Sequence, residues 1–374
     1  MNAVSQAGTI TLSDAGVAAP ARKAYVDVFR GLLIAHMALD HASLMFNAGR
    51  GGEELATSAP AASADIFQFL TRFTGVPVAP GFFFMAGFMV ALTSFAREAR
   101  GVADAEITRR LIVRGLVLLA VDAVIMGVPR AAMGFYSFVV LSAIGASLIL
   151  LASLRHVPSK VLLPAALAVL VLHPLLDVSA LPVALRAILY EPVRTGAFRS
   201  LYPVIPWAAI VLLGFIAGRD AATRDRPLTF WLWLAAISAA LFFAIRLAGG
   251  YGNAYPYTSI THLDFWSFSK YPPDLPFLSF AFAAIFLALA TVWKVTRTHT
   301  PALLRPFEIF GRVPFFFYVV HFYVLGLAAA VVRTKVGLGA TYLIWLALLV
   351  VMLWPCAWYF EKKRNRPNFI TRYF

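Results

Sequence analysis

Long apolar runs alternate with short polar and basic segments along almost the whole chain. Most of these runs have the ~17–25 residues that a helix needs to cross the hydrocarbon core of a bilayer. The pattern therefore predicts an all-α, polytopic membrane protein with about ten transmembrane helices. The predicted spans lie near residues 28–47, 75–95, 108–128, 134–154, 160–178, 203–218, 228–248, 276–294, 313–333 and 341–360.

Composition agrees with lipid as the main solvent of this chain. Hydrophobic residues make up 61% of it and charged residues 13%, whereas a soluble domain carries about 25% charged residues. The net charge of +14 does not indicate a nucleic-acid partner, because the basic residues form short clusters between apolar runs. Such clusters are typical of the cytoplasmic loops of membrane proteins.

The distribution of Lys and Arg predicts the orientation. With the N-terminus inside, most basic residues fall on the cytoplasmic side, so both termini are expected in the cytoplasm and the protein in the inner (plasma) membrane. The longer connections, 48–65, 179–202 and 249–275, then lie outside. The last is rich in Tyr, Gly and Pro; its aromatic rings fit either sugar stacking or an interfacial aromatic belt.

The domain organisation follows from the same pattern. We expect a flexible tail at 1–21, one transmembrane domain at 22–361 and a basic cytoplasmic tail at 362–374. Cys356 is the one cysteine, so neither a disulfide within the chain nor a cysteine-based metal site is expected. The oligomeric state stays open, with a homo-oligomer among the alternatives.

The first predicted span carries the most ionisable groups. At ~100° per residue, Arg30 and His41 differ by only about 20° around the helix axis. They share a face and lie roughly 16 Å apart along the axis at ~1.5 Å per residue. His36 and Asp40 form an i,i+4 pair on another part of the surface. Ionisable groups within a span are expensive and mark functional sites by default.

Two interpretations of this face remain open. In the functional one, Arg30 holds a phosphate-bearing cofactor near the cytoplasmic end and His41 serves as a general base near the other side. Asp40 is grouped with His41 as a candidate catalytic residue. It points about 100° away from His41, so we expect it to pair with a basic residue on another span. In the structural interpretation, His41 bonds to a neighbouring helix and Arg30 reaches the interface.

Other polar residues within the spans carry weaker signals. Arg72 precedes Pro77, Pro80 and Gly81, which predict broken helix of the kind that lines a cavity or is buried in protein. Single polar residues in other spans are expected to form interhelical hydrogen bonds. These are Asp122, His173 and His321.

Several motifs together resemble a known family. Arg30 and His41, separated by ten residues, resemble the hallmark of the transmembrane acyltransferase superfamily. The chain is more specifically similar to bacterial relatives of the heparan-alpha-glucosaminide N-acetyltransferase catalytic domain. The matching stretches are Asp27-Val-Phe-Arg-Gly-Leu-Leu-Ile, Ala79-Pro-Gly-Phe-Phe-Phe-Met-Ala-Gly87, Leu201-Tyr-Pro-Val-Ile-Pro-Trp207, Lys270-Tyr-Pro-Pro273, Gly311-Arg-Val-Pro-Phe-Phe-Phe-Tyr-Val-Val-His321 and a basic tail after Trp354-Pro355.

The resemblance implies a membrane enzyme that takes an acetyl group from cytoplasmic acetyl-CoA, or another acyl group from acyl-CoA, as co-substrate. It delivers the group to a glycan or other acceptor beyond the membrane, without a metal. The resemblance implies that His41 acts as base or acyl relay. It implies cofactor contacts for Arg30, Arg72 and Arg312, and acceptor contacts for Lys270 and Tyr271.

One position departs from the family pattern. Many bacterial relatives carry a histidine in the second-span motif where this chain has Val76. This difference favours a second hypothesis, a catalytically silent relative. A third hypothesis is a transporter or lipid-binding protein whose buried charges line a permeation path, although the spans show no internal duplication of the kind that many transporters carry.

Overall fold

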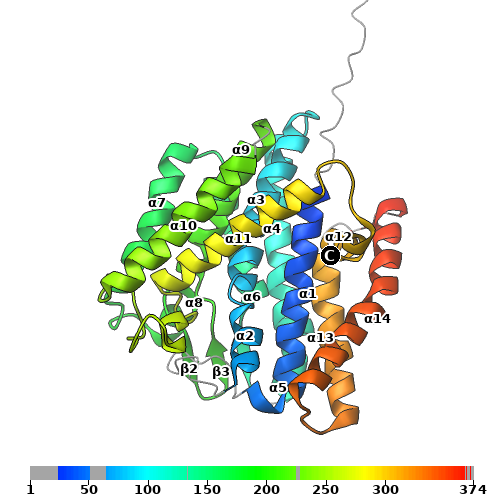
Figure 1. The fold of residues 1–374 in the computed structure, drawn as a ribbon. Helices are drawn as coiled ribbons and strands as arrows, with labels where there is room; N and C mark the ends of the chain where they lie inside the picture. The colour runs from blue at the N-terminus through cyan, green and yellow to red at the C-terminus, as the bar shows by residue number, and fades with distance from the viewer. Residues whose placement is uncertain are drawn as a thin grey trace, which may run out of the picture.

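The fold is that of a helical bundle with one small sheet (Figure 1). The computed structural model describes residues 24–50, 65–132, 134–224 and 228–366, together with Asn368 and Thr371. The predicted tail at 1–21, most of the loop at 48–65 and the end of the basic tail lie outside the described residues. The α-helices are α1 (Ala24–Phe46), α2 (Ile66–Phe73), α3 (Val78–Glu98), α4 (Asp104–Ala120), α5 (Gly127–Ala132), α6 (Val140–Leu154), α7 (Ser159–Leu172), α8 (Val183–Leu189), α9 (Val204–Thr223), α10 (Leu228–Ala248), α11 (Leu275–Val295), α12 (Arg305–Arg312), α13 (Pro314–Val332) and α14 (Leu338–Asn365).

Short helical turns and strands occupy the connections. Segment η2 (Val121–Ile125) is a π-helix that continues α4. The 3-10 turns are η1 (Ala48–Arg50), η3 (His173–Leu175), η4 (Leu263–Trp266) and η5 (Ala302–Leu304). The strands are β1 (Tyr136–Phe138), β2 (Val193–Thr195) and β3 (Phe198–Ser200), with β3 in the middle, parallel to β1 and antiparallel to β2.

The helical membrane architecture predicted from the apolar runs is confirmed. Each predicted span contains a helix, although strand β1 occupies the start of the span predicted at 134–154. Seven helical segments of the described chain are long and apolar enough to cross a membrane. These are Ile66–Glu98, Asp104–Ala131, Val204–Thr223, Leu228–Ala248, Leu275–Val295, Pro314–Val332 and Leu338–Asn365.

The other three predicted spans are less clear-cut. Helix α1 is 23 residues long, but its charged and histidine side chains make it less apolar. Helices α6 and α7 are shorter: the 15 residues of α6 span about 22 Å at 1.5 Å per residue, less than the ~30 Å hydrocarbon core. The count of about ten spans and the side on which the termini lie therefore stay predictions.

Helix α1 occupies a central position and packs closely against α12. A Cβ atom added at Gly31 would lie 1.7 Å from the Phe307 carbonyl oxygen, and one at Gly311 would lie 1.7 Å from the Asp27 carbonyl oxygen. Only glycine permits such an approach, so the two backbones touch. This contact fixes the start of α1 beside the residues that precede α13.

Glycines also set two other helix crossings. On α3, a Cβ at Gly87 would lie 1.9 Å from the Val211 carbonyl oxygen of α9, and one at Gly214 would lie 1.9 Å from that of Phe84. Helices α4 and α6 meet through Gly115 and Gly145 in the same way. Small residues at these points let membrane helices approach at backbone distance.

The connection between α10 and α11 is organised around a buried arginine. The Arg246 guanidinium donates hydrogen bonds to the backbone carbonyls of Phe265, Tyr255 and Asp264 and to the side chain of Asn253. It also lies over the Tyr257 ring at 4.9 Å. One side chain thereby holds together the long loop at 249–275.

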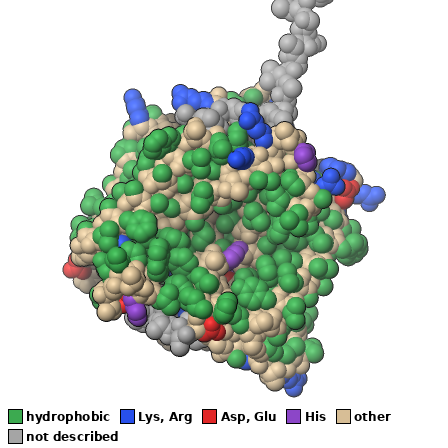
Figure 2. Space-filling model, in the orientation of Figure 1, with side chains coloured by type: hydrophobic (Ala, Val, Ile, Leu, Met, Phe, Trp, Pro, Cys, Tyr) green, Lys and Arg blue, Asp and Glu red, His purple; other side chains and the backbone are tan. Residues whose placement is uncertain are grey.

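The surface of the molecule reflects its surroundings. Figure 2 shows hydrophobic side chains over the middle of one face, with Lys and Arg gathered mainly along its upper edge. Helix α1 begins near this edge (Figure 1). Large apolar side chains stay exposed on the outer helices, as expected where lipid rather than water is the solvent; examples are Trp233, Leu327, Val350 and Trp354.

Candidate active site

His41 pairs with a histidine from a distant part of the chain. The His41 Nδ1 atom lies 2.9 Å from Nε2 of His321 on α13, and the two rings stack with centroids 5.2 Å apart. Phe322 and Tyr318, also on α13, contact the His41 ring. The sequence predicted an interhelical hydrogen bond for His321, and the structure shows that its partner is the candidate base itself.

The hydrogen bonds of this pair define where its basic nitrogen lies. His321 Nδ1 lies 2.9 Å from the backbone carbonyl of Phe317, and a carbonyl only accepts, so Nδ1 of His321 carries the proton. Nε2 of neutral His321 then accepts from Nδ1–H of His41. Neutral His41 is left with an unprotonated Nε2, which can take a proton from another molecule.

Asp40 contacts Arg50 rather than His41. Its carboxylate lies 2.9 Å from the Arg50 guanidinium, which also donates to the Asp40 backbone carbonyl at 2.7 Å. No hydrogen bond joins Asp40 to His41 in the described part of the chain. Asp40 pairs with a basic residue, but the expectation that this residue lies on another span is wrong: Arg50 is in the turn η1 directly after α1.

A cavity of about 590 Å³ opens beside the start of α1. It lies between α1, α3, α4, α13 and the end of α14, and seven of its lining side chains are basic. They are Arg30, Arg97, Arg100, Arg114, Arg312, Lys363 and Arg364. We call this cavity the cationic vestibule. A ligand that carries several phosphates matches such a surface better than a neutral one.

A second, narrower cavity of about 110 Å³ continues from the vestibule. Both cavities are lined by Arg30, Arg114, Met89, Pro314 and Phe315. The rest of its lining is almost entirely apolar and includes Phe82, Met85, Leu118, Leu141, Ile144 and Leu148. We call it the apolar chamber.

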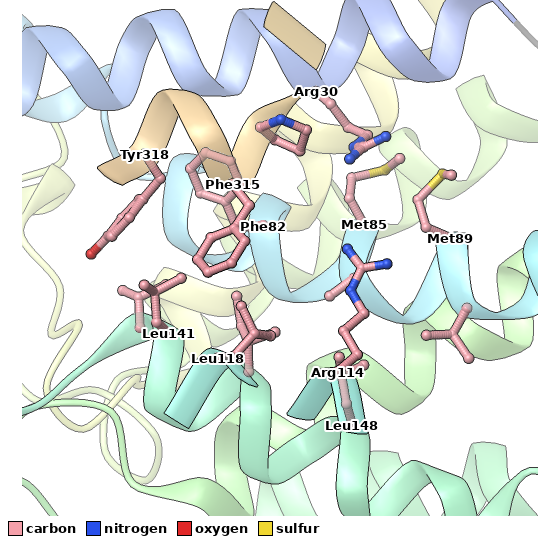
Figure 3. A pocket seen from close by; sticks show the side chains of 15 residues that line it. Arg30, Phe82, Met85, Met89, Arg114, Leu118, Leu141, Leu148, Phe315 and Tyr318 are labelled. Atoms are coloured by element: carbon pink, nitrogen blue, oxygen red, sulfur yellow. The ribbon is translucent and has the colours of Figure 1, made fainter. Parts of the chain in front are cut away.

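The apolar chamber leads toward the histidine pair. Tyr318 lines it, and the Tyr318 ring also contacts the rings of His41 and His321. Figure 3 shows Arg30 and Arg114 pointing toward one another at one side of the chamber, with Tyr318 at the other. Tyr318 therefore separates the apolar chamber from the histidine pair.

Arg114 was not among the residues singled out from the sequence. It interrupts the apolar run Leu111-Ile-Val-Arg-Gly-Leu-Val, and within the described residues no carboxylate lies at ion-pair distance from it. Arg97 adds a further positive charge within electrostatic reach. An arginine that faces two others without a counter-ion is suited to binding an anion. Its position inside an apolar run was the signal that could have revealed it.

Arg30 and Arg312 meet around one carboxylate. Asp27 is buried and lies 3.5 Å from the Arg30 guanidinium and 3.9 Å from that of Arg312. Arg312 also pairs with Glu308 on its own helix. The close contact between α1 and α12 brings these residues together, so two of the three predicted cofactor contacts line the vestibule.

The third predicted cofactor contact lies elsewhere. Arg72 is in the last turn of α2, toward the lower end of the bundle in Figure 1, whereas α1 begins at the upper end. It lines neither cavity. Its Nε atom is buried without a hydrogen-bond partner in the described part of the molecule. Its role in cofactor binding stays a prediction without a supporting contact.

The predicted acceptor contacts differ in accessibility. The Tyr271 ring is buried, and its hydroxyl lies 2.7 Å from the Tyr202 hydroxyl, so its face is not open for stacking on a sugar. Lys270 lies 5.1 Å from the Tyr271 ring centroid. Its charge, like those of Arg50 and Arg130, is within electrostatic reach of His41.

Val76 lies in the turn between α2 and α3 and packs against the apolar core. His36 lines a small cavity together with Thr74, Pro77 and Val78 from the same segment. An imidazole from α1 therefore lies beside the turn where many bacterial relatives carry a histidine. The His41–His321 pair belongs to a different contact, between α1 and α13.

Comparison with known families gives one match. A family model described as "Heparan-alpha-glucosaminide N-acetyltransferase, catalytic" matches residues 22–238, more than half of the 374-residue chain. The matched segment contains Arg30, His41 and Arg114, whereas Arg312 and His321 lie beyond it. No curated protein matches the chain.

Proposed function

Because the chain belongs to the heparan-alpha-glucosaminide N-acetyltransferase catalytic family, we propose that it transfers an acetyl group from acetyl-CoA to an acceptor on the other side of the membrane. The family implies a membrane acetyltransferase in general. The observation that supports the finer proposal is that the vestibule and the chamber share five lining residues, while Tyr318 of the chamber contacts both histidine rings.

The vestibule fits the polar half of acetyl-CoA. Its basic side chains come from α1, α3, α4, α12 and α14, so they surround a ligand from several directions. Arg114 has no carboxylate partner among the described residues and is therefore available to a phosphate. Phe95, Phe315 and Phe360 also line the vestibule and offer faces on which an adenine ring can stack. Arg30 and Arg114 lie where the basic lining of the vestibule meets the apolar lining of the chamber.

The apolar chamber fits the uncharged arm that carries the thioester. Met85, Met89 and the leucines around them exclude water, which protects a thioester from hydrolysis. Arg30 and His41 are eleven residues apart, or roughly 16 Å along the helix. An extended arm that carries the thioester would therefore span the distance between the phosphate-binding arginines and the base. Tyr318 stands at the end of this path beside both histidines.

In the proposed transfer, His41 acts as the general base. Its Nε2 takes the proton from the acceptor hydroxyl or amine, whose oxygen or nitrogen then bonds to the acetyl carbon. The bond between that carbon and the CoA sulfur breaks, and the proton passes to the sulfur, so His41 becomes neutral again. In this proposal His321 holds the required tautomer, and the Tyr318 hydroxyl donates to the oxyanion that develops on the carbonyl.

The proposed topology determines the side of the membrane from which the acceptor approaches. We propose that about ten helices cross the inner membrane with both termini in the cytoplasm, which puts the vestibule inside and the loop at 249–275 outside. A glycan or another hydroxyl- or amine-bearing molecule would then approach His41 from the outer side. Lys270, which is close enough to His41 to act on its charge, is the acceptor contact that this arrangement favours.

Acetyl transfer by purified protein tests the proposal. We expect CoA and acetyl-CoA to raise the thermal unfolding midpoint, and wild-type protein to release CoA from acetyl-CoA in the presence of acceptor. His41→Gln should abolish this release and keep the CoA-induced stabilisation, because Gln has no basic nitrogen. The matched control is His36→Gln on the same helix, which lines a separate cavity and should stay active.

Two other outcomes would refute the enzyme hypothesis. A catalytically silent relative would bind CoA yet produce no free CoA from acetyl-CoA at any acceptor concentration. A transporter would show solute flux that persists without CoA and would be unaffected by His41→Gln.

A further inference from the structure

A separate cavity lies on another side of α3 from the vestibule. It has a volume of about 270 Å³ and is bounded by α3, the turn between α6 and α7, and α9. On α3, Ser94 and Glu98 line this cavity, whereas Thr93 and Arg97 line the vestibule. At ~100° per residue these two pairs point about 100° apart around the helix. Among the described residues, Phe95 alone lines both cavities, so the cavity is separate from the proposed acetyl-CoA site.

Its lining provides one cation whose hydrogen-bonding capacity is only partly used. The Arg219 guanidinium donates to the Val157 backbone carbonyl at 2.7 Å and lies over the Phe215 ring at 5.1 Å. No carboxylate within the described ranges lies at ion-pair distance from it. Its other N–H groups are left for a ligand, and a guanidinium fork is well matched to a phosphate.

The lining also provides an anion with a free oxygen. Glu98 Oε1 lies 3.0 Å from the Arg155 guanidinium, whereas its other oxygen has no partner in the part of the chain that the structure describes. The Glu98 side chain is half exposed. Arg155 is itself neutralised twice, by Glu98 and by Asp104. Among the described residues, the cavity therefore presents on α9 a positive group without a carboxylate partner and, on α3, a carboxylate with one open oxygen.

This charge pattern selects against a polyanion and in favour of a zwitterion. Several phosphates would meet the Glu98 carboxylate, whereas a single phosphate with a nearby ammonium would pair with Arg219 and Glu98 at once. Ala91, Phe95 and Phe215 supply an apolar wall, and Phe95 is partly exposed at the surface. Ser94 lies on the floor, and its buried hydroxyl has no partner among the described residues.

We propose that this cavity binds a phosphoethanolamine group, with Arg219 holding the phosphate and Glu98 the primary ammonium. The group reaches the cavity either as the headgroup of a phospholipid or as a free phosphate ester. Basic pockets between helices at the membrane interface are established sites for lipid headgroups. Since the cavity shares α3 with the vestibule, occupancy would brace one wall of the proposed acetyl-CoA site.

Thermal unfolding of the full-length protein in detergent tests the assignment. Phosphatidylethanolamine, phosphatidylglycerol and phosphatidylcholine are titrated separately, together with soluble phosphoethanolamine. We expect phosphatidylethanolamine to stabilise at the lowest concentration, because phosphatidylglycerol lacks the ammonium and the quaternary choline donates no hydrogen bond. Stabilisation by the soluble ester would identify a free ester as a source, and its absence beside a lipid response would identify the lipid.

Variants separate the two proposed contacts. Arg219→Gln should weaken the phosphatidylethanolamine response about tenfold, the loss expected for one charge-assisted hydrogen bond. Glu98→Gln should remove the preference over phosphatidylglycerol. Arg224→Gln is the matched control, because Arg224 caps the same helix but pairs with Asp220 away from the cavity. Arg219→Lys, which keeps the charge, provides a second variant with an intermediate response.

Three results would overturn the assignment: equal stabilisation by all three lipids, an unchanged response in Arg219→Gln, or the same loss in Arg224→Gln. CoA-induced stabilisation is measured in parallel and should survive in Arg219→Gln. Failure of the headgroup proposal is thereby distinguished from failure of the proposed acetyltransferase function.

Discussion

Replacing Arg114 by Gln is expected to weaken acetyl-CoA binding without weakening the fold. Arg114 lines both cavities and faces Arg30, and Arg97 acts on it electrostatically. Its removal relieves repulsion between like charges, so the unfolding midpoint of the free protein should stay constant or rise. In the complex, the loss of one charge-assisted hydrogen bond to a phosphate costs about 1.5–3 kcal/mol.

That free energy corresponds to a loss of CoA affinity of about 10- to 150-fold. Titration calorimetry or CoA-dependent thermal shift measures it, at two ionic strengths because salt screens the charge. Arg109→Gln is the matched control: it lies on the same helix, is largely exposed and pairs with Glu106. Unchanged CoA affinity in Arg114→Gln, or an equal loss in the control, would show that the vestibule does not bind the phosphates.

Three further substitutions examine the base, the helix contact and the outer loop. His321→Gln removes the group that sets the tautomer of His41, so single-turnover transfer should slow by about 10²-fold with CoA affinity retained; unchanged turnover would contradict the tautomer argument. Gly31→Ala places a Cβ 1.7 Å from a carbonyl oxygen and should cost about 3 kcal/mol of unfolding free energy, measured by thermal unfolding. Gly326→Ala is the control: a Cβ there meets no atom within 4 Å, so its unfolding free energy should be nearly unchanged. Arg246→Gln leaves buried carbonyls without donors, at about 1–3 kcal/mol each, so limited proteolysis should cleave the 249–275 loop; equal protection in the variant would mean that other contacts hold this loop.

The sequence predicts the helices well because lipid imposes a simple rule on composition. Every run of sufficient length and apolarity became a helix, since backbone groups in a bilayer must bond within their own segment. The rule is least informative where helices are short or polar. Helix α6 begins later than its predicted span and α7 ends earlier, and α1 tolerates its charges because neighbouring helices cover them. A hydropathy pattern does not contain those neighbours.

Local geometry also identified one face of the site. Arg30 and His41 were placed on the same side of the first span from helical periodicity alone, and in the structure both lie where α1 meets α13. The partner of His41 was beyond reach, because His321 is 280 residues away and no periodicity links two separate helices.

The surroundings of Tyr271 were also not visible in the sequence. It lies in a loop rich in aromatics, and its hydroxyl contact with Tyr202 buries its ring, while its role in acceptor binding stays a prediction. Arg114 was overlooked because the positive-inside rule already explains single arginines near the ends of spans, so none of them stands out as a candidate site residue. Its significance depends on the side chains that three other helices bring near it.

The hydrogen bond between His41 and His321 can form only late in biosynthesis, because His321 is synthesised long after His41. At about 5–20 residues per second, ribosomes complete α13 roughly 15 to 55 s after α1 has emerged. During that interval the charges of α1 lack the helices that later cover them, and the base has no partner to fix its proton. A chain truncated after α11 should therefore leave α1 open to added protease in isolated membranes, whereas the full chain should protect it.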